Sequence, residues 1–180
     1  MSGTERTHPH LAVIMGVSGS GKSTVAEALA AQLGWELLEG DDLHPAANIA
    51  KMAAGHPLTD ADREPWLEAI AAWIAQRVDA GESGLVTCSA LKRSYRDILR
   101  APMIRHPEAE LTFVLLTGSR ELLLQRMTER PGHFMPASLL DSQLATLEPP
   151  GPDENSVTVE IGPPPAEVAA AARKALGLET

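Results

Sequence analysis

Short apolar segments alternate with segments of helical periodicity along this chain. Strands are predicted at residues 11–15, 35–39, 84–88, 111–116 and 157–161. Helices are predicted at residues 24–33, 46–54, 65–81, 119–129 and 137–147, with one more ending near Arg100 and an Ala-rich one after 163–165. This alternation predicts a parallel sheet with helices on both faces. Ligands of such sheets bind beyond the carboxyl ends of the strands.

Two local features qualify this pattern. Thr59 and Asp60 are candidate helix caps, and Pro65 suits the first position of the long helix that follows. Residues 130–136 are poor at continuing a helix and interrupt the pattern between two helices.

Length and composition indicate one domain. We expect residues 1–10 to form a disordered polar tail and residues 11–180 a single domain. No apolar run approaches the roughly 20 residues of a membrane span, and residues 1–10 lack the apolar region of a signal peptide. A soluble protein without a membrane partner is therefore expected. The one cysteine, Cys88, fits a reducing cytoplasm and is read as a core residue.

The net charge of −9 argues against a nucleic-acid partner, which would require a basic surface. Eight of the fifteen Lys and Arg residues nevertheless lie between residues 92 and 130. A local cationic segment in an acidic protein suits a small anionic substrate, although solvated helix faces would give the same count.

One motif stands between the first strand and the first helix. It fits G-x-x-x-x-G-K-[ST], and with the next residue it comprises Gly16, Val17, Ser18, Gly19, Ser20, Gly21, Lys22, Ser23 and Thr24. Glycine backbones in such a loop approach phosphate oxygens closely, and the following helix N-terminus favours an anion. Lys22 supplies positive charge for the β- and γ-phosphates, and the Ser23 hydroxyl is a Mg²⁺ ligand. The chain is predicted to bind ATP and Mg²⁺.

The class of nucleotide enzyme can be narrowed further. The sequence contains neither N-K-x-D nor D-x-x-G, which weakens a GTPase interpretation, and it is short for a motor ATPase. Small kinases remain, with an acceptor site built by inserted helices and a lid that carries arginines.

Several motifs together resemble those of bacterial gluconate kinases. They are the segments 16–24, 40–45, 57–67, 88–97 and 132–136, with Ser142-Gln143 after them. The resemblance implies a three-layer P-loop NTPase fold with a five-stranded, mostly parallel sheet, similar to shikimate and nucleoside monophosphate kinases. It implies phosphorylation of D-gluconate at its 6-hydroxyl by ATP and Mg²⁺, and a homodimer. A shikimate-type kinase and a non-catalytic nucleotide sensor are the alternatives.

The acceptor side has one candidate base. Asp41 follows the second strand, where its carboxylate can accept the hydroxyl hydrogen of the acceptor, and capping of the next helix by Asp41 or Asp42 is the alternative. His44 is a candidate for a sugar hydroxyl or, before Pro45, for a structural turn.

A substrate carboxylate is best matched by guanidinium or clustered cations. Arg63 is one candidate. Lys92 and Arg96 lie four residues apart, so a helix would direct both to one pocket, whereas Arg93 would be offset into solvent.

The interruption after the fifth predicted helix suggests a lid around residues 126–138. Arg126 and Arg130 lie four residues apart beside it, and an arginine there can stabilise the negative charge that develops on the transferred phosphate. The alternative is that either arginine only interacts favourably with the negative end of the helix macrodipole. His133 is a candidate contact for substrate or phosphate.

The remaining expectations concern the Mg²⁺ ligands and the residues that contact adenine. Glu39-x-Asp41 resembles the D-x-D of shikimate kinases only loosely, and no aspartate ends the third strand, so Ser23 is expected as the direct Mg²⁺ ligand. Residues 151–155 are the expected region of adenine contacts.

Overall fold

The computed structural model describes residues 8–129 and 137–178, and its centre is a five-stranded parallel sheet. The strand order is β2-β3-β1-β4-β5. The strands are β1 (His10–Met15), β2 (Glu36–Glu39), β3 (Gly84–Thr87), β4 (Glu110–Thr117) and β5 (Ser156–Glu160). All four neighbouring pairs are parallel. The predicted parallel sheet is confirmed.

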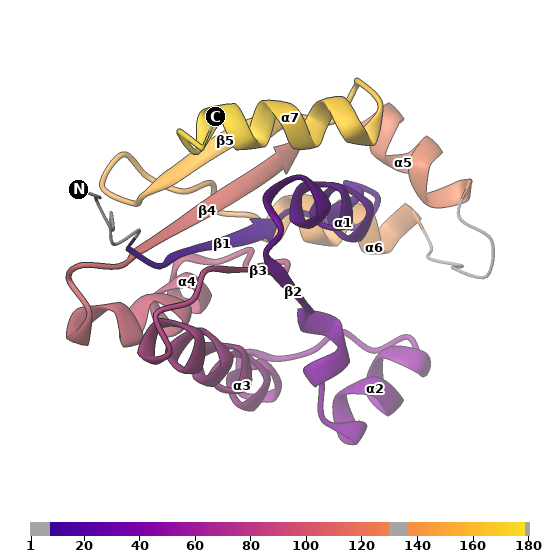
Figure 1. Cartoon of the computed structure of the whole chain (residues 1–180). Helices are drawn as coiled ribbons and strands as arrows, with labels where there is room; N and C mark the ends of the chain where they lie inside the picture. Colours follow the sequence, from indigo (N-terminus) through magenta and orange to yellow (C-terminus); the bar gives the residue numbers. More distant parts are fainter. Residues whose placement is uncertain (1–7, 130–136, 179–180) are drawn as a thin grey trace, which may run out of the picture.

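Helices cover both faces of this sheet (Figure 1). The helices are α1 (Lys22–Leu33), α2 (Ala46–Ala53), α3 (Asp60–Asp79), α4 (Arg93–Arg100), α5 (Arg120–Thr128), α6 (Ala137–Thr146) and α7 (Pro165–Ala175). Two short 3₁₀ helices, η1 (Gly40–Leu43) and η2 (Ala101–Arg105), complete the described elements. Figure 1 shows α1 and α7 on one face and α3 and α4 on the other, which gives three layers.

The alternation of side chains along β1 explains why two hydrophobic cores form. Ala12 and Ile14 belong to the core under α1 and α7. Leu11, Val13 and Met15 belong to the core under α3 and α4. Because successive strand residues face opposite sides, a strand buried on both faces must be apolar throughout.

Cys88 lies in the second of these cores, directly after β3. Burial raises the pKa of its thiol to about 12, so the group stays protonated at neutral pH. Its interpretation as a core residue is consistent with this position. No helix in the described part of the chain combines the length and the apolarity that crossing a membrane requires.

Two elements begin earlier than the sequence suggested. β1 starts at His10, whose buried imidazole lies 3.0 Å from the Thr112 hydroxyl, although His10 was assigned to the polar tail. Helix α3 starts at Asp60, so placing Pro65 at its first position was wrong. The reason is a capping box, in which the Thr59 hydroxyl accepts from the Asp62 N–H and the Asp62 carboxylate accepts from the Thr59 N–H.

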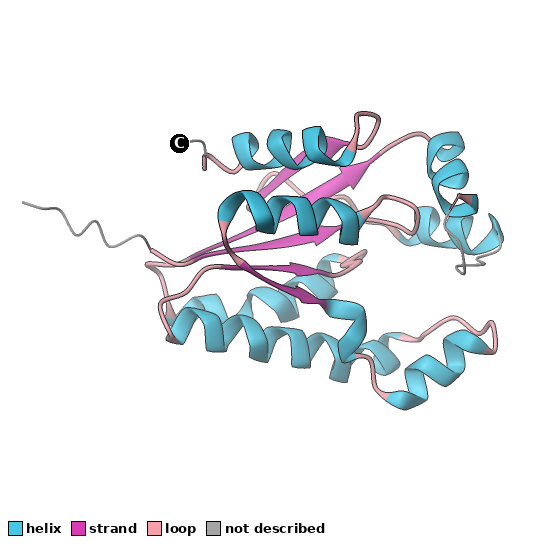
Figure 2. Cartoon of the chain, turned by 45° about the vertical axis from the view of Figure 1, so that its right-hand side comes forward, coloured by secondary structure: helices cyan, strands magenta, loops and turns pink. Residues whose placement is uncertain are grey.

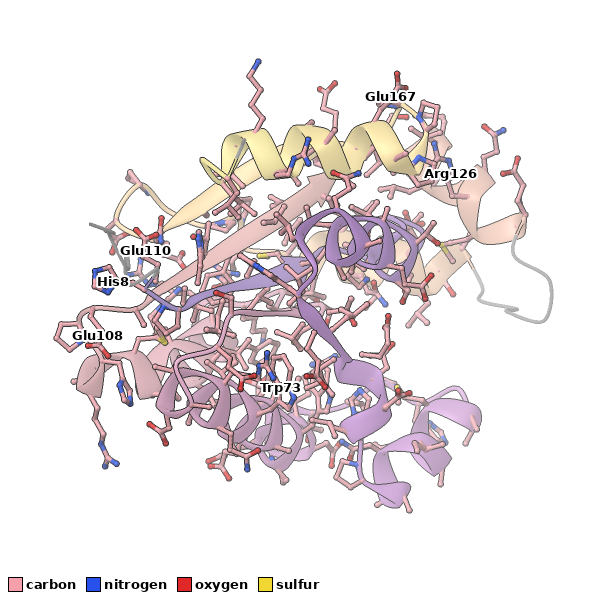
Figure 3. The ribbon with its side chains drawn as sticks, viewed as in Figure 1. His8, Trp73, Glu108, Glu110, Arg126 and Glu167 are labelled. Carbon is pink, nitrogen blue, oxygen red and sulfur yellow. The ribbon has the colours of Figure 1, made fainter. Side chains whose placement is uncertain are left out.

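The parallel strands give the molecule two different ends. Figure 2 shows the strand arrows pointing towards the end where α2, α5 and α6 lie. In Figure 3, Arg126 and Glu167 lie at this carboxyl end, and Glu110 lies at the opposite one. The loops after β1, β2 and β3 therefore share one edge, where a ligand site is expected.

Candidate active site

The loop between β1 and α1 has the backbone that its glycines permit. Gly19 and Gly21 have φ angles of +85° and +81°, which other residues rarely adopt. A Cβ on Gly19 would lie only 2.5 Å from the Leu123 carbonyl oxygen, so α5 packs directly against the loop. Helix α1 begins at Lys22, and the N–H groups of its first turn therefore adjoin the loop. This geometry suits an anionic ligand.

Side chains hold the loop in place. The Lys22 ammonium donates to the carbonyl oxygens of Gly16 (2.9 Å) and Val17 (3.2 Å). From α6, the Gln143 side chain accepts from the Ser18 N–H (2.7 Å) and donates to the Ser18 hydroxyl (3.0 Å). Gln143 thus ties the helix after the predicted lid to the loop. It lies in one of the motifs that resemble those of gluconate kinases, but the sequence indicated no role for it.

The Ser23 hydroxyl donates to the Glu39 carboxylate at the end of β2. Their oxygens are 2.9 Å apart, and the same carboxylate oxygen accepts from the Thr87 hydroxyl at 2.8 Å. The second oxygen, Oε1 of Glu39, is buried and has no hydrogen-bond partner among the described residues. An unpaired buried carboxylate oxygen is costly, which indicates that it serves a ligand.

This arrangement fits Mg²⁺. The ion prefers oxygen ligands, commonly one or two from protein together with phosphates and water. A hydroxyl and a carboxylate lie together beside the phosphate loop, so the site contains more than the Ser23 ligand that the sequence suggested. Neither here nor elsewhere among the described residues do three or more His, Cys, Asp or Glu side chains gather in a group that could hold a metal, so phosphates and water would have to complete the coordination.

Asp41 projects from η1, directly after β2. Its side chain is 82% exposed, and no side chain caps either η1 or α2 in the structure. The capping alternative for Asp41 and Asp42 is therefore not observed. Gly40 lets η1 pack closely against the end of β3, because a Cβ there would lie 2.0 Å from the Thr87 carbonyl oxygen. The Trp66 indole also donates to the Gly40 carbonyl, which holds this segment in place.

His44 packs inside this segment. Its ring stacks on that of Trp66, with centroids 4.1 Å apart, and its side chain is 5% exposed. The Nε2 atom lies 3.9 Å from Oδ1 of Asp41. Burial lowers the pKa of the imidazole, the Asp41 carboxylate opposes this effect, and the Arg63 guanidinium adds to it.

Arg63 and Lys92 reach one polar cluster from different elements. Arg63 of α3 donates to the Tyr95 hydroxyl (2.9 Å), which in turn donates to the Asp60 carboxylate. The Lys92 ammonium lies 3.2 Å from the same carboxylate. Both cations also lie over the Tyr95 ring. Two of the predicted carboxylate-binding cations are thus brought together.

The charges in this cluster stabilise one another. The hydrogen bond from Tyr95, followed by that from Lys92, lowers the pKa of Asp60. The hydrogen bond to Asp60 raises the pKa of Lys92. Both ionised forms are therefore favoured at neutral pH.

Arg96 does not share the face of Lys92 and is not at this cluster. Its side chain is fully buried, with Nε and Nη2 bound to the Glu154 carboxylate and Nη1 to the Ala90 carbonyl. The helical-spacing argument fails because Lys92 is the extended N-cap of α4 and not part of it. The placement of Arg96 in the substrate pocket is corrected accordingly.

Arg126 lines a pocket of about 160 Å³ that contains none of the residues of the Tyr95–Asp60 cluster. Its guanidinium donates to the Ile161 carbonyl (2.9 Å) beyond β5. The pocket is also lined by residues 19–21 of the loop, Thr24, Val25, Glu129, Pro165 and Val168. Arg126 is thus adjacent to the loop, but its guanidinium is bound to the segment after β5. Arg130 and His133, and most of the predicted lid, lie outside the described residues.

Residues 151–155 lie along α4, and none of them lines the pocket beside the phosphate loop. The Asn155 amide donates to the Leu111 carbonyl, near the start of β4, and Asp153 pairs with Arg93. The structure therefore does not support the expectation that residues 151–155 contact adenine. The segment adjoining the loop is instead the one after β5, from Ile161 to Val168.

Comparisons with known proteins agree with this geometry. A family model described as AAA domain matches residues 11–150. A gluconokinase from Gluconobacter oxydans is 54% identical over 151 residues, which is 84% of this chain and 82% of that protein. The thermoresistant gluconokinase of Escherichia coli is 47% identical over 161 residues, covering 88% and 87% of the two chains.

Solved structures give the same result. The crystal structure of a gluconokinase from Sinorhizobium meliloti has a TM-score of 0.81 and 50% identity, covering 94% of this chain and 92% of that one. A shikimate kinase from Acinetobacter baumannii in complex with shikimate has a TM-score of 0.57 and 18% identity, covering 96% and 95%. The second likeness concerns the fold alone.

Proposed function

The chain belongs to the gluconokinase family, and we propose that it transfers the γ-phosphate of ATP to the 6-hydroxyl of D-gluconate, giving 6-phospho-D-gluconate and ADP. One observation carries the proposal beyond family membership. The phosphate loop after β1, Glu39 and Asp41 at the end of β2, and the cationic cluster formed between α3 and the segment after β3 meet at one edge of the sheet. This arrangement supports adjoining sites for nucleotide, metal and anionic acceptor.

Phosphoryl transfer requires positioning and charge stabilisation more than covalent chemistry. Asp41 accepts the hydrogen of the attacking hydroxyl and aims its oxygen at the γ-phosphate. Lys22 and the N–H groups of residues 16–24 bind the phosphates and stabilise the charge that develops on them. Ser23 and Glu39 would hold Mg²⁺, which neutralises phosphate charge when bound.

The carboxylate of the acceptor is assigned to Arg63 and Lys92. Both are held at the Tyr95–Asp60 cluster, so an incoming carboxylate meets two cations already in position. His44 is assigned to a hydroxyl of the same substrate. Arg96 is left out of this set because Glu154 occupies its guanidinium.

The pocket at Arg126 is assigned to the adenine of ATP. It adjoins the phosphate loop, and its Ile161, Pro165 and Val168 offer apolar contact area while the guanidinium offers a planar cation. Arg130 and His133 complete the proposal as lid residues, on the sequence argument alone. Closure of such a lid would exclude water, which otherwise would accept the phosphate.

The proposal also includes a homodimer in the cytoplasm. The dimer rests on the resemblance to gluconate kinases, and the location on the single buried cysteine, which suits a reducing compartment. The net charge of −9 supports the absence of nucleic acid among the partners.

The test is ADP release coupled to a spectrophotometric readout, with MgATP and a panel of D-gluconate, shikimate, glycerate and AMP. Saturable turnover with D-gluconate alone is expected. Turnover with shikimate or glycerate instead of D-gluconate would contradict the assignment of the acceptor but support the assignment as a kinase. Binding of ATP without acceptor-dependent turnover would favour a nucleotide sensor.

A further inference from the structure

Asn48 contacts His44 from inside the protein. It lies on α2, one turn after His44, and only 5% of its surface is exposed. A buried polar side chain normally has hydrogen-bond partners, so the contacts of this amide indicate its role. The Nδ2 atom of Asn48 has two neighbours, the Asp62 carbonyl oxygen at 2.9 Å and Nδ1 of His44 at 3.3 Å.

These two contacts fix the orientation of the amide. The Asp62 carbonyl only accepts hydrogen bonds, so the amide atom facing it must be the NH₂ group. The same NH₂ group faces Nδ1 of His44, so Nδ1 must be the acceptor. In a neutral imidazole the proton then resides on Nε2.

Nε2 points to the acceptor side of the site. It lies 3.9 Å from Oδ1 of Asp41, which is too long for a hydrogen bond and leaves the N–H able to donate to a third group. Stacking on Trp66 prevents the ring from turning away. A donor at this position complements the Asp41 carboxylate, which only accepts.

We propose that Asn48 is a positioning residue that holds His44 as the Nε2–H tautomer, so that the imidazole donates a hydrogen bond to a hydroxyl oxygen of the acceptor beside Asp41. The inference rests on the proposed function for the identity of the acceptor, but the tautomer itself is independent of it. A substrate with a hydroxyl next to the reacting one supplies both a hydrogen for Asp41 and an oxygen for His44. A lone alcohol would use only half of this pair.

The neutral ring is a further requirement, and the surroundings favour it. The charged groups that face His44 are Asp41 from η1 and Arg63 from α3. Burial is the largest influence and disfavours the imidazolium, and the two charged neighbours act in opposite directions.

The decisive measurement is the tautomer, read from long-range ¹H–¹⁵N correlation spectra of the histidine rings in the whole chain. The wild-type protein should show His44 with an unprotonated Nδ1 and a protonated Nε2. Asn48→Asp replaces the donor by an acceptor and should move the proton to Nδ1 or charge the ring. A wild-type ring protonated at Nδ1, or an unchanged tautomer in Asn48→Asp, would overturn the proposal.

Kinetics of Asn48→Ala supply the second test, since this variant removes the donor without adding charge. Loss of one positioned hydrogen bond predicts a KM for D-gluconate about 3- to 10-fold higher and an unchanged KM for ATP. In a His44→Ala background the same substitution should have almost no further effect. Equal effects in both backgrounds would show that Asn48 acts only on the fold.

Thr112→Val is the matched control. The Thr112 hydroxyl contacts Nε2 of His10, the other deeply buried histidine of the described residues, near the start of β4. This variant should change the ring signals of His10 and leave those of His44 and the KM for D-gluconate unaltered. If wild-type protein has the predicted tautomer but no activity on D-gluconate, the proposed function fails while the assignment of Asn48 stands.

Discussion

The Arg96 guanidinium and the Glu154 carboxylate form a two-point ion pair in the interior, with side chains that are 0% and 2% exposed. Arg96 also donates to the carbonyl of Ala90, which has a φ of +46° and is the one described non-glycine residue with a positive φ. Directly before it, the Ser89 carbonyl accepts from the Gly16 N–H at the start of the phosphate loop. The buried pair thus supports a strained turn that contacts the loop.

Arg96→Ala should therefore destabilise the protein and spare substrate recognition. Removing Arg96 leaves the buried Glu154 carboxylate with only Arg100 and the Gly151 N–H as partners, at a cost of up to roughly 3–5 kcal/mol in the free energy of unfolding. Urea denaturation measures this loss. Arg93→Ala, which removes the exposed pair with Asp153, is the control and should cost far less. A folded Arg96→Ala protein with a greatly raised KM for D-gluconate would restore Arg96 to the substrate site.

Glu154 predicts how stability depends on pH. Hydrogen bonds from Arg96 lower its pKa from 4.5 to about 2 in the folded state. The unfolded chain then binds the proton more readily, so this stability is fully present above pH 4.5 and is lost as pH falls towards 2. Unfolding free energies measured across this window should fall with a slope that Glu154→Gln reduces. Asp62, whose pKa is also about 2, should keep some slope in that variant.

The order of elements could be predicted because it depends on local patterns. Apolar runs and helical spacing are properties of neighbouring residues, and the glycine-rich motif carries its own geometry. The start of α3 was misplaced because Pro65 is a weaker signal than the reciprocal bonds of Thr59 and Asp62.

The contacts between distant segments could not be predicted in this way. Whether Arg96 faces a ligand or Glu154 depends on how α4 docks near the loop before β5, and the two residues are 58 positions apart. The Ser23–Glu39 bond likewise depends on how α1 and the end of β2 meet. The Glu39 carboxylate at the end of β2 was a usable signal, but β2 pairs with β3 and not with β1, so the order of strands along the chain does not reveal that Glu39 reaches the loop.

Glu39→Gln should raise the Mg²⁺ requirement. The substitution keeps the shape of the side chain but removes its charge, and losses in metal affinity of about 10-fold or more accompany such changes around metal sites. Turnover measured against free Mg²⁺ at saturating ATP gives the activation constant. Glu36→Gln, on the same strand but paired with Arg77, is the matched control. Identical Mg²⁺ dependence in both variants would argue that Glu39 only orients Ser23.

Asp41→Asn should lower kcat with little change in either KM. An amide cannot take the hydroxyl hydrogen, and loss of a positioned base costs roughly 10²- to 10⁴-fold in rate. Asp42→Asn, the exposed neighbour in η1, is the control and should retain activity. Steady-state kinetics with MgATP and D-gluconate distinguish the two. An Asp41→Asn enzyme within 3-fold of wild type would remove Asp41 from the reaction.

Lys92→Ala should weaken binding of the acceptor more than it slows the reaction. The ammonium is oriented by Asp60 and lies over the Tyr95 ring, so its charge is available to a carboxylate without further ordering. Loss of a charge-assisted hydrogen bond predicts a KM for D-gluconate roughly 10- to 100-fold higher, with the KM for ATP unchanged. The uncharged analogue glucitol separates recognition of charge from recognition of hydroxyls.

Glucitol lacks the carboxylate, so any turnover with it should be insensitive to Lys92→Ala. Arg93→Ala, one residue further along the chain, is the matched control, because its guanidinium is bound to Asp153 and not to the Tyr95–Asp60 cluster. It should leave the KM for D-gluconate near the wild-type value. If Arg93→Ala and Lys92→Ala raise that KM equally, the effect is one of net charge, and the carboxylate does not bind at the cluster on α3 and the start of α4.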